Sequence, residues 1–156
     1  MLERTPGWVM APEVSFSVYG ERGVIDQLAF HPGTRSLLVI ELKTEIVDVQ
    51  ELVGTMSRKV PLARGVALER GWKARSVSGW IVVAPSTTNG RRILAHRTML
   101  RAAFNSDGRT MRNWMLAPHG SVAGLSMWSP TNRGGTGSGL APVKRVAAPQ
   151  RRAGRA

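Results

Sequence analysis

The sequence predicts an α/β fold in which helices pack against a mixed β-sheet. Two observations support this prediction. Three short apolar stretches separated by turn residues precede residue 44, which is the pattern of successive strands. A helical pattern of apolar residues then leads to another apolar stretch at 77–84, and such a succession is typical of a crossover between parallel strands. With 156 residues, 42% of them hydrophobic, the chain is expected to form one folded domain with an ordinary core.

The first two strands are predicted at 8–18 and 24–30. Pro12 restricts the first strand to a sheet edge or a bulge, because proline cannot donate a hydrogen bond to a neighbouring strand. Gly20 and Gly23 mark the turn between the two strands.

A third strand is predicted at 37–43, after the loop HPGTR at 31–35. Proline and glycine are typical of hairpin loops, so 24–30 and 37–43 are expected to pair antiparallel. Apolar residues fill both faces of the third strand up to Glu41, which indicates a central position in the sheet.

A helix is predicted after Asp48, which can act as its N-cap. Apolar residues then recur at helical spacing: Val49, Leu52, Val53, Met56, Val60, Ala63 and Ala67. Pro61 is expected to bend or break this helix, and Gly71 to end it. The strand at 77–84 should then lie parallel to 37–43. The remaining predicted elements are helices at 91–104 and 109–116, capped by Asn89 or Gly90 and by Asp107, and a short strand at 122–128.

Charge and composition restrict the partners that the chain can have. The net charge is +12 and the sequence pI about 11.7, which points to a polyanion, most simply nucleic acid. The chain has no cysteine, which excludes disulfides and fits a reducing cytoplasm. The N-terminus lacks the apolar region of a signal peptide, and no stretch approaches the ~18 apolar residues of a membrane span. We therefore expect a cytoplasmic protein that does not bind membranes.

The C-terminal part differs in composition from the rest of the chain. Residues 130–156 are rich in Gly, Pro, Ser and Ala and carry only basic charges: Arg133, Lys144, Arg145, Arg151, Arg152 and Arg155. Such a segment buries too little apolar surface to become ordered. We predict a folded domain at 1–129 and a disordered basic tail at 130–156. The tail is either an arm that binds phosphates without sequence preference or a solvated extension with no role.

Two acids and a lysine occur within the best predicted strands. Glu41 and Lys43 end the third strand and share a face, because residues two apart on a strand point the same way. If the hairpin forms around HPGTR, Asp26 lies roughly opposite Glu41, at about 5 Å. The two carboxylates would repel each other unless a cation lies between them.

Mg²⁺ or Mn²⁺ suits a mixed shell of carboxylates and water, so Asp26 and Glu41 are the expected metal ligands. Lys43 is then placed to polarise a water and to stabilise charge that develops on a phosphate. A Glu-x-Lys at a strand end is also common on solvated edges. The apolar strand, the acid on the preceding strand and the basic chain favour a metal site that acts on a phosphodiester.

The same residues carry a resemblance to a known family. Asp26, followed after a hairpin by Glu41-Leu42-Lys43, is similar to the motif of the PD-(D/E)XK nuclease superfamily. The run PEVSFSVYGERGVIDQLAFHP…LLVIELKTEIVDVQELVGTMSRK resembles the nuclease-like domain of bacterial proteins in which it often follows a helix-turn-helix domain. The resemblance covers roughly 8–128. It implies a restriction-endonuclease-like αβββαβ core, here with the first core helix missing or shortened. It also implies Mg²⁺-dependent cleavage of DNA, with Asp26 and Glu41 as ligands and Lys43 as the catalytic lysine.

Further candidates have both functional and structural interpretations. Glu13 on the first strand could join the acids or lie in solvent, and Gln50 on the helix could lie near the metal or be a surface residue. Several basic residues could contact phosphates or form solvated faces: Arg58, Lys59, Arg91, Arg92, Arg97 and Arg101.

Two functions remain open from the sequence. One is a metal-dependent nuclease acting on DNA. The other is a noncatalytic nucleic-acid-binding or regulatory module on the same scaffold, as an N-terminally truncated relative of a protein with a helix-turn-helix domain. Both interpretations are compatible with a homodimer and with a separate DNA-binding domain or protein as a partner.

Overall fold

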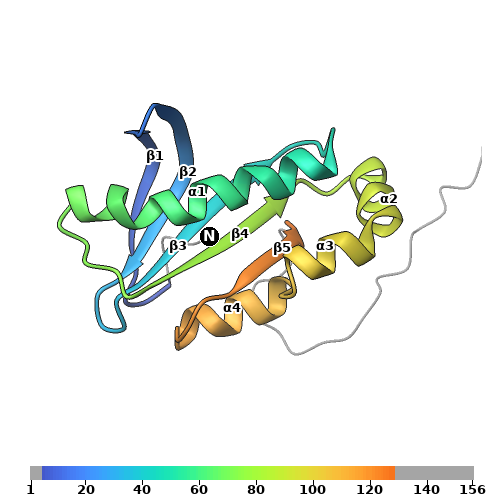
Figure 1. Ribbon diagram of the computed structural model, residues 1–156. Coiled ribbons are helices and arrows are strands. Elements are labelled where there is room, and N and C mark those ends of the chain that lie inside the picture. Colours follow the sequence, from blue (N-terminus) through green and yellow to red (C-terminus); the bar gives the residue numbers. More distant parts are fainter. Residues whose placement is uncertain (1–4, 129–156) are drawn as a thin grey trace, which may run out of the picture.

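The structure is a computed structural model that describes residues 5–128. Within this range a mixed five-stranded sheet is packed against four helices, so the predicted α/β class is confirmed (Figure 1). The strand order across the sheet, β1-β2-β3-β4-β5, is the same as the order along the chain. The strands are β1 (Val9–Val18), β2 (Glu21–His31), β3 (Ser36–Lys43), β4 (Ser76–Val83) and β5 (Ala123–Met127).

The strand directions agree with the sequence pattern. β1 pairs antiparallel with β2, and β2 pairs antiparallel with β3, which confirms the predicted hairpin around HPGTR. β3 and β4 are parallel, as expected from the helix that connects them, and β5 is parallel to β4. β1 is an edge strand, as predicted from Pro12. No strand of the described residues pairs with its outer side, so the missing N–H of Pro12 costs no hydrogen bond there.

Helix α1 (Val49–Glu69) begins at its predicted cap. The Asp48 carboxylate accepts hydrogen bonds from the backbone N–H groups of Gln50 and Glu51, at 2.8 and 3.4 Å. Of the bend or break predicted at Pro61, the break does not occur, because α1 continues through this proline to Glu69. Pro61 and Ser57 are both exposed. The Ser57 carbonyl, which loses its usual helical donor, therefore lies where solvent can hydrate it.

The single helix predicted at 91–104 is also wrong. The chain forms α2 (Thr87–Ala95) and α3 (Arg97–Ala103), which are separated by the nonhelical backbone of His96 (φ −113°, ψ 21°). α2 begins earlier than predicted because Ser86 is its N-cap and accepts a hydrogen bond from the Asn89 N–H at 3.0 Å. The final helix is α4 (Gly108–Leu116), which has Asp107 as its predicted cap.

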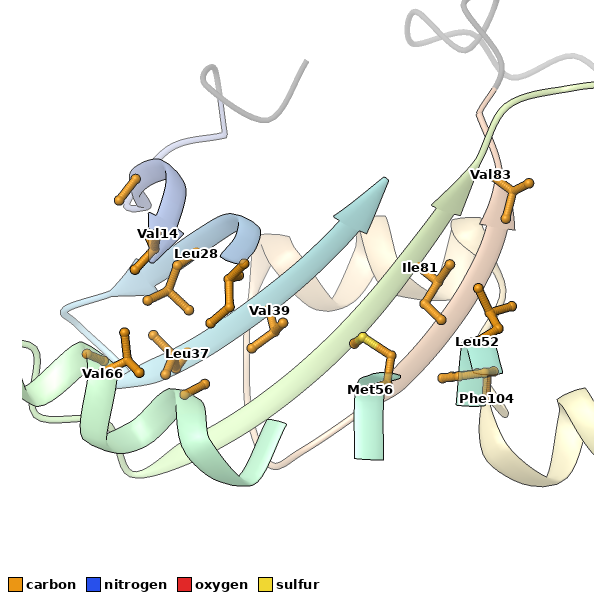
Figure 2. Close-up of a cluster of buried hydrophobic side chains, with 14 of the residues drawn as sticks. Val14, Leu28, Leu37, Val39, Leu52, Met56, Val66, Ile81, Val83 and Phe104 are labelled. Atoms are coloured by element: carbon orange, nitrogen blue, oxygen red, sulfur yellow. The ribbon is translucent and has the colours of Figure 1, made fainter. Parts of the chain in front are cut away.

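Apolar side chains form one cluster on each face of the sheet. α1 and α3 cover one face, where Leu52 and Met56 of α1 lie near Ile81 of β4 and Phe104 (Figure 2). α4 covers the other face through Met111, Trp114 and Met115, which pack with Trp80 of β4. α1 approaches β4 closely because Gly79 has no side chain: a Cβ there would collide with the Met56 methyl group.

Two further predictions concern membrane-spanning helices and the C-terminal tail. In the described residues no helix has the length and apolar character needed to cross a membrane. The tail predicted at 130–156 lies outside the described residues.

Candidate functional site

Asp26 and Glu41 lie together where the regular backbone pairing of β2 and β3 ends. Regular pairing includes Gln27 with Ile40, and the next residues along each strand are the two acids. There the carboxylates accept hydrogen bonds from the neighbouring strand. The Leu42 N–H donates to Asp26 Oδ2 at 2.8 Å, and the Asp26 N–H lies 3.5 Å from Glu41 Oε1. The register therefore brings Asp26 opposite Glu41, as the hairpin predicted.

Glu13 on β1 lies beside the two acids in the register of the sheet. Its neighbours Pro12 and Val14 pair with Gln27 and Ile25, which places Glu13 opposite Asp26 by register. The Glu13 backbone has a positive φ of 48°. This conformation interrupts the regular alternation of side chains between the two faces of β1. The side chain of Glu13 is exposed, and the described residues contain no group of three or more His, Cys, Asp or Glu arranged to hold a metal.

Glu41 is buried and forms an ion pair. It is 1% exposed, and its Oε2 lies 2.7 Å from the Nζ of Lys59 on α1. Burial raises the pKa of Glu41 above its ordinary value, and the nearby charge of Asp26 raises it further. The hydrogen bond and the positive charge of Lys59 lower this pKa, but the net shift is upward. The same Lys59 ammonium donates to the Val24 carbonyl on β2 at 2.6 Å. Lys59 therefore connects α1 with both strands of the site.

The position of Lys59 follows from the helical repeat of α1. Met56 and Ala63 are buried against the sheet, and Lys59 is three residues after one and four before the other, so it shares their face. The sequence interpretation gave Lys59 either a contact with phosphate or a place on a solvated face. A lysine in the middle of an apolar helical face, opposite an acid on the central strand, was the signal for this ion pair.

Lys43 lies two residues beyond Glu41 on β3, so the two side chains share the face that α1 covers. It lines a small hollow of about 160 Å³ between the end of β3 and the first turns of α1, together with Asp48 and Glu51. Among the described residues it forms no ion pair. Gln50, the other candidate on this helix, is exposed in the first turn of α1.

Asn89 fixes the loop that follows Lys43. It is fully buried, and its side-chain amide donates to the carbonyls of Thr44 and Ala84 at 3.0 and 2.9 Å. Its side-chain oxygen accepts from the Ile46 N–H at 3.0 Å. Sequence reasoning considered Asn89 only as a helix cap. Here it connects the ends of the parallel strands β3 and β4 through side-chain contacts, which a sequence pattern does not reveal.

The arginines that could contact phosphates or form solvated faces lie in separate groups. Arg92 bonds to the Ile46 carbonyl and lies 3.4 Å from Glu45, so it supports the same loop as Asn89. Arg97 and Arg101 line a hollow of about 880 Å³ between α2, α3, α4 and β5. Arg58 and Arg91 are exposed.

The donor set at Asp26 and Glu41 fits a hard divalent cation. Mg²⁺ in proteins is commonly held by one or two carboxylates, and water and phosphate oxygens complete its shell. Two carboxylates on adjacent strands meet this requirement, with Mn²⁺ as an alternative. The arrangement could thus hold a metal and a phosphate beside Lys43.

Comparison of the chain with known proteins gives no relative. No family model matches it, and no match was found among curated proteins or solved structures.

Proposed function

We propose that this protein is a metal-dependent nuclease that hydrolyses DNA phosphodiester bonds. The observation that supports the proposal best is the meeting of Asp26 and Glu41 at the end of the β2–β3 pairing, with Lys43 on the same face as Glu41. The net charge of +12 favours a polyanionic substrate.

The proposal includes the finer fold assignment. The succession β1-β2-β3-α1-β4, with β3 parallel to β4, corresponds to the βββαβ part of a restriction-endonuclease-like core. In that fold the acids of the second and third strands and the lysine after the second acid form the active site, as the resemblance of the sequence implies.

Each residue then has a separate role. Asp26 and Glu41 would hold Mg²⁺ or Mn²⁺, which supplies Lewis-acid activation of water and of the phosphate when bound. Lys43 orients the attacking water and stabilises the negative charge that develops on the phosphate oxygens. Asn89 acts indirectly, because its hydrogen bonds fix the loop that begins directly after Lys43.

A second candidate is a noncatalytic nucleic-acid-binding module on the same scaffold. The observation that favours it is the ion pair between Lys59 and Glu41. This ion pair already neutralises the charge of Glu41, one of the two proposed metal ligands. In a noncatalytic module, the role of the acids is structural: they connect the strands with α1.

Cleavage assays separate the two candidates. Wild type, Lys43→Ala, Asp26→Asn and Glu41→Gln are incubated with plasmid and with short duplexes in Mg²⁺, Mn²⁺, Ca²⁺ or chelator. Lys73→Ala is the matched control, since Lys73 is an exposed lysine outside the site. For a nuclease, Lys43→Ala lowers the rate of cleavage by about 10²–10³-fold and leaves DNA binding unchanged, because it removes an interaction made in the transition state.

The two acid variants should lose metal binding as well as cleavage, because a neutral amide is a poor ligand for a hard cation. Ca²⁺ should support DNA binding with little cleavage. Intact DNA binding without cleavage in any metal would establish the noncatalytic module instead. Nicking that survives all three substitutions would assign the activity to another site or a contaminant.

A further inference from the structure

Lys59 places a positive charge on the oxygen atoms that the proposed metal would use. We propose that the Lys59 ammonium substitutes for the divalent cation in the metal-free protein and must leave Glu41 before a metal binds there. The inference rests on the proposed function and adds a regulatory step to it, namely an exchange between an internal cation and an external one.

The contacts of Lys59 are those of a bound cation. Its Nζ lies 2.7 Å from the Glu41 carboxylate and 2.6 Å from the Val24 carbonyl. Carboxylate and backbone carbonyl oxygens are also the ligands that hard divalent cations use. These two oxygens belong to the adjacent strands β2 and β3. One cation between them therefore holds the two strands together at this point.

Charge and burial make the two cations mutually exclusive. The Glu41 side chain is 2% exposed and needs a positive partner, because an unpaired buried charge is strongly unfavourable. A divalent ion at the same carboxylate would lie against the Lys59 ammonium and be repelled by it. Asp26 and Glu41 carry two negative charges, but with Lys59 in place the net charge of the three is only −1.

Lys59 can leave without unfolding the helix. Its side chain is 16% exposed, and a lysine stem is long enough to carry the ammonium to solvent while its methylene groups stay packed. The exchange therefore requires rotation of one side chain on α1, with the fold of the helix unchanged.

Direct metal titration tests the exchange. Mn²⁺ binding is measured by the loss of the free-ion paramagnetic resonance signal, without DNA, for wild type and Lys59→Met. Arg58→Met is the matched control, because it removes an exposed positive charge from the neighbouring position of α1. We expect Lys59→Met to bind Mn²⁺ at least tenfold more tightly than wild type, and Arg58→Met to remain close to wild type. The gain should disappear in the double variant Lys59→Met, Glu41→Gln.

Equal Mn²⁺ affinity in wild type and Lys59→Met would overturn the inference, as would a gain that persists in the double variant. Lys59→Gln is measured in parallel because its amide can still donate to the Val24 carbonyl. If neither Lys59 variant folds in saturating Mn²⁺, by circular dichroism, the lysine has a structural role and the inference is wrong. Tighter metal binding without DNA cleavage would uphold the exchange and reject the nuclease, whereas cleavage by wild type with equal affinities would do the reverse.

Discussion

The side-chain oxygen of Asn89 accepts a hydrogen bond from the Ile46 N–H at 3.0 Å, which joins α2 to the loop between β3 and α1. The same side chain donates to Thr44 and Ala84. All of its polar atoms are thus bonded at a fully buried position. Together with Arg92, this amide fixes the loop that begins directly after Lys43.

Asn89→Ala should therefore destabilise the protein by about 2–4 kcal/mol, because it leaves buried backbone groups without partners. Urea unfolding measures this loss, with Asn113→Ala, an exposed asparagine on α4, as the control. A loss of less than about 0.5 kcal/mol, the range of ordinary surface substitutions, would contradict the central role of Asn89.

Glu41 predicts a specific dependence of stability on pH. Its folded-state pKa is raised above 4.5 by burial, so below that value the carboxyl is protonated in both states and its burial is not penalised. As the pH rises through the folded-state pKa, the folded protein loses stability, because the unfolded chain ionises more readily. Glu41→Gln cannot ionise. Its free energy of unfolding relative to wild type should therefore increase from pH 4.5 towards neutral pH, measured by denaturant titration in chelator. A difference that stays constant or decreases over this range would be inconsistent with the burial of Glu41.

Two glycines in contrasting surroundings test the packing of α1 on the sheet. Gly79→Ala adds a methyl group against Val60 and the flexible end of Met56, which must shift, and should cost about 1 kcal/mol through overpacking. Gly65→Ala on α1 meets no atom within 4 Å and should instead stabilise the protein by about 0.5–1 kcal/mol, since alanine favours a helix. Thermal unfolding of the two variants checks both signs. Equal effects would mean that α1 does not approach β4 this closely.

The basic tail predicts a change in salt dependence. Residues 130–156 carry six basic residues and no acid. Removal of this segment should leave the folded domain intact. If all six residues contact phosphates, the slope of log K against log salt for duplex DNA should become less negative by about 5. Fluorescence anisotropy at several salt concentrations measures the slope, and an unchanged slope would assign the tail no electrostatic role.

The sequence predicted the strands and the facing acids because these depend on local rules. Strand alternation and the HPGTR loop set the pairing of β2 with β3, and this register brings Asp26 opposite Glu41. The cap at Asp48 follows from the same kind of local chemistry.

The features that the sequence did not predict depend on tertiary contacts. Lys59 turns inward because an acid on a distant strand offers it a partner, and Asn89 is buried because three backbone groups from two other loops converge on it. The separation of α2 from α3 at His96 has no proline or glycine to mark it. Periodicity describes which face of an element is apolar, but it does not identify the polar partners that a given side chain meets.

The hydrogen bond from the Leu42 N–H to the Asp26 carboxylate gives this protein a native spectroscopic probe. The nuclear magnetic resonance frequency of an amide proton responds to the charge of the acceptor it faces, and this acceptor is one of the two acids proposed as metal ligands. Leu42 is half-exposed, and its backbone amide can be observed without any substitution. One resonance of the unmodified backbone thereby reports whether a cation has bound at Asp26.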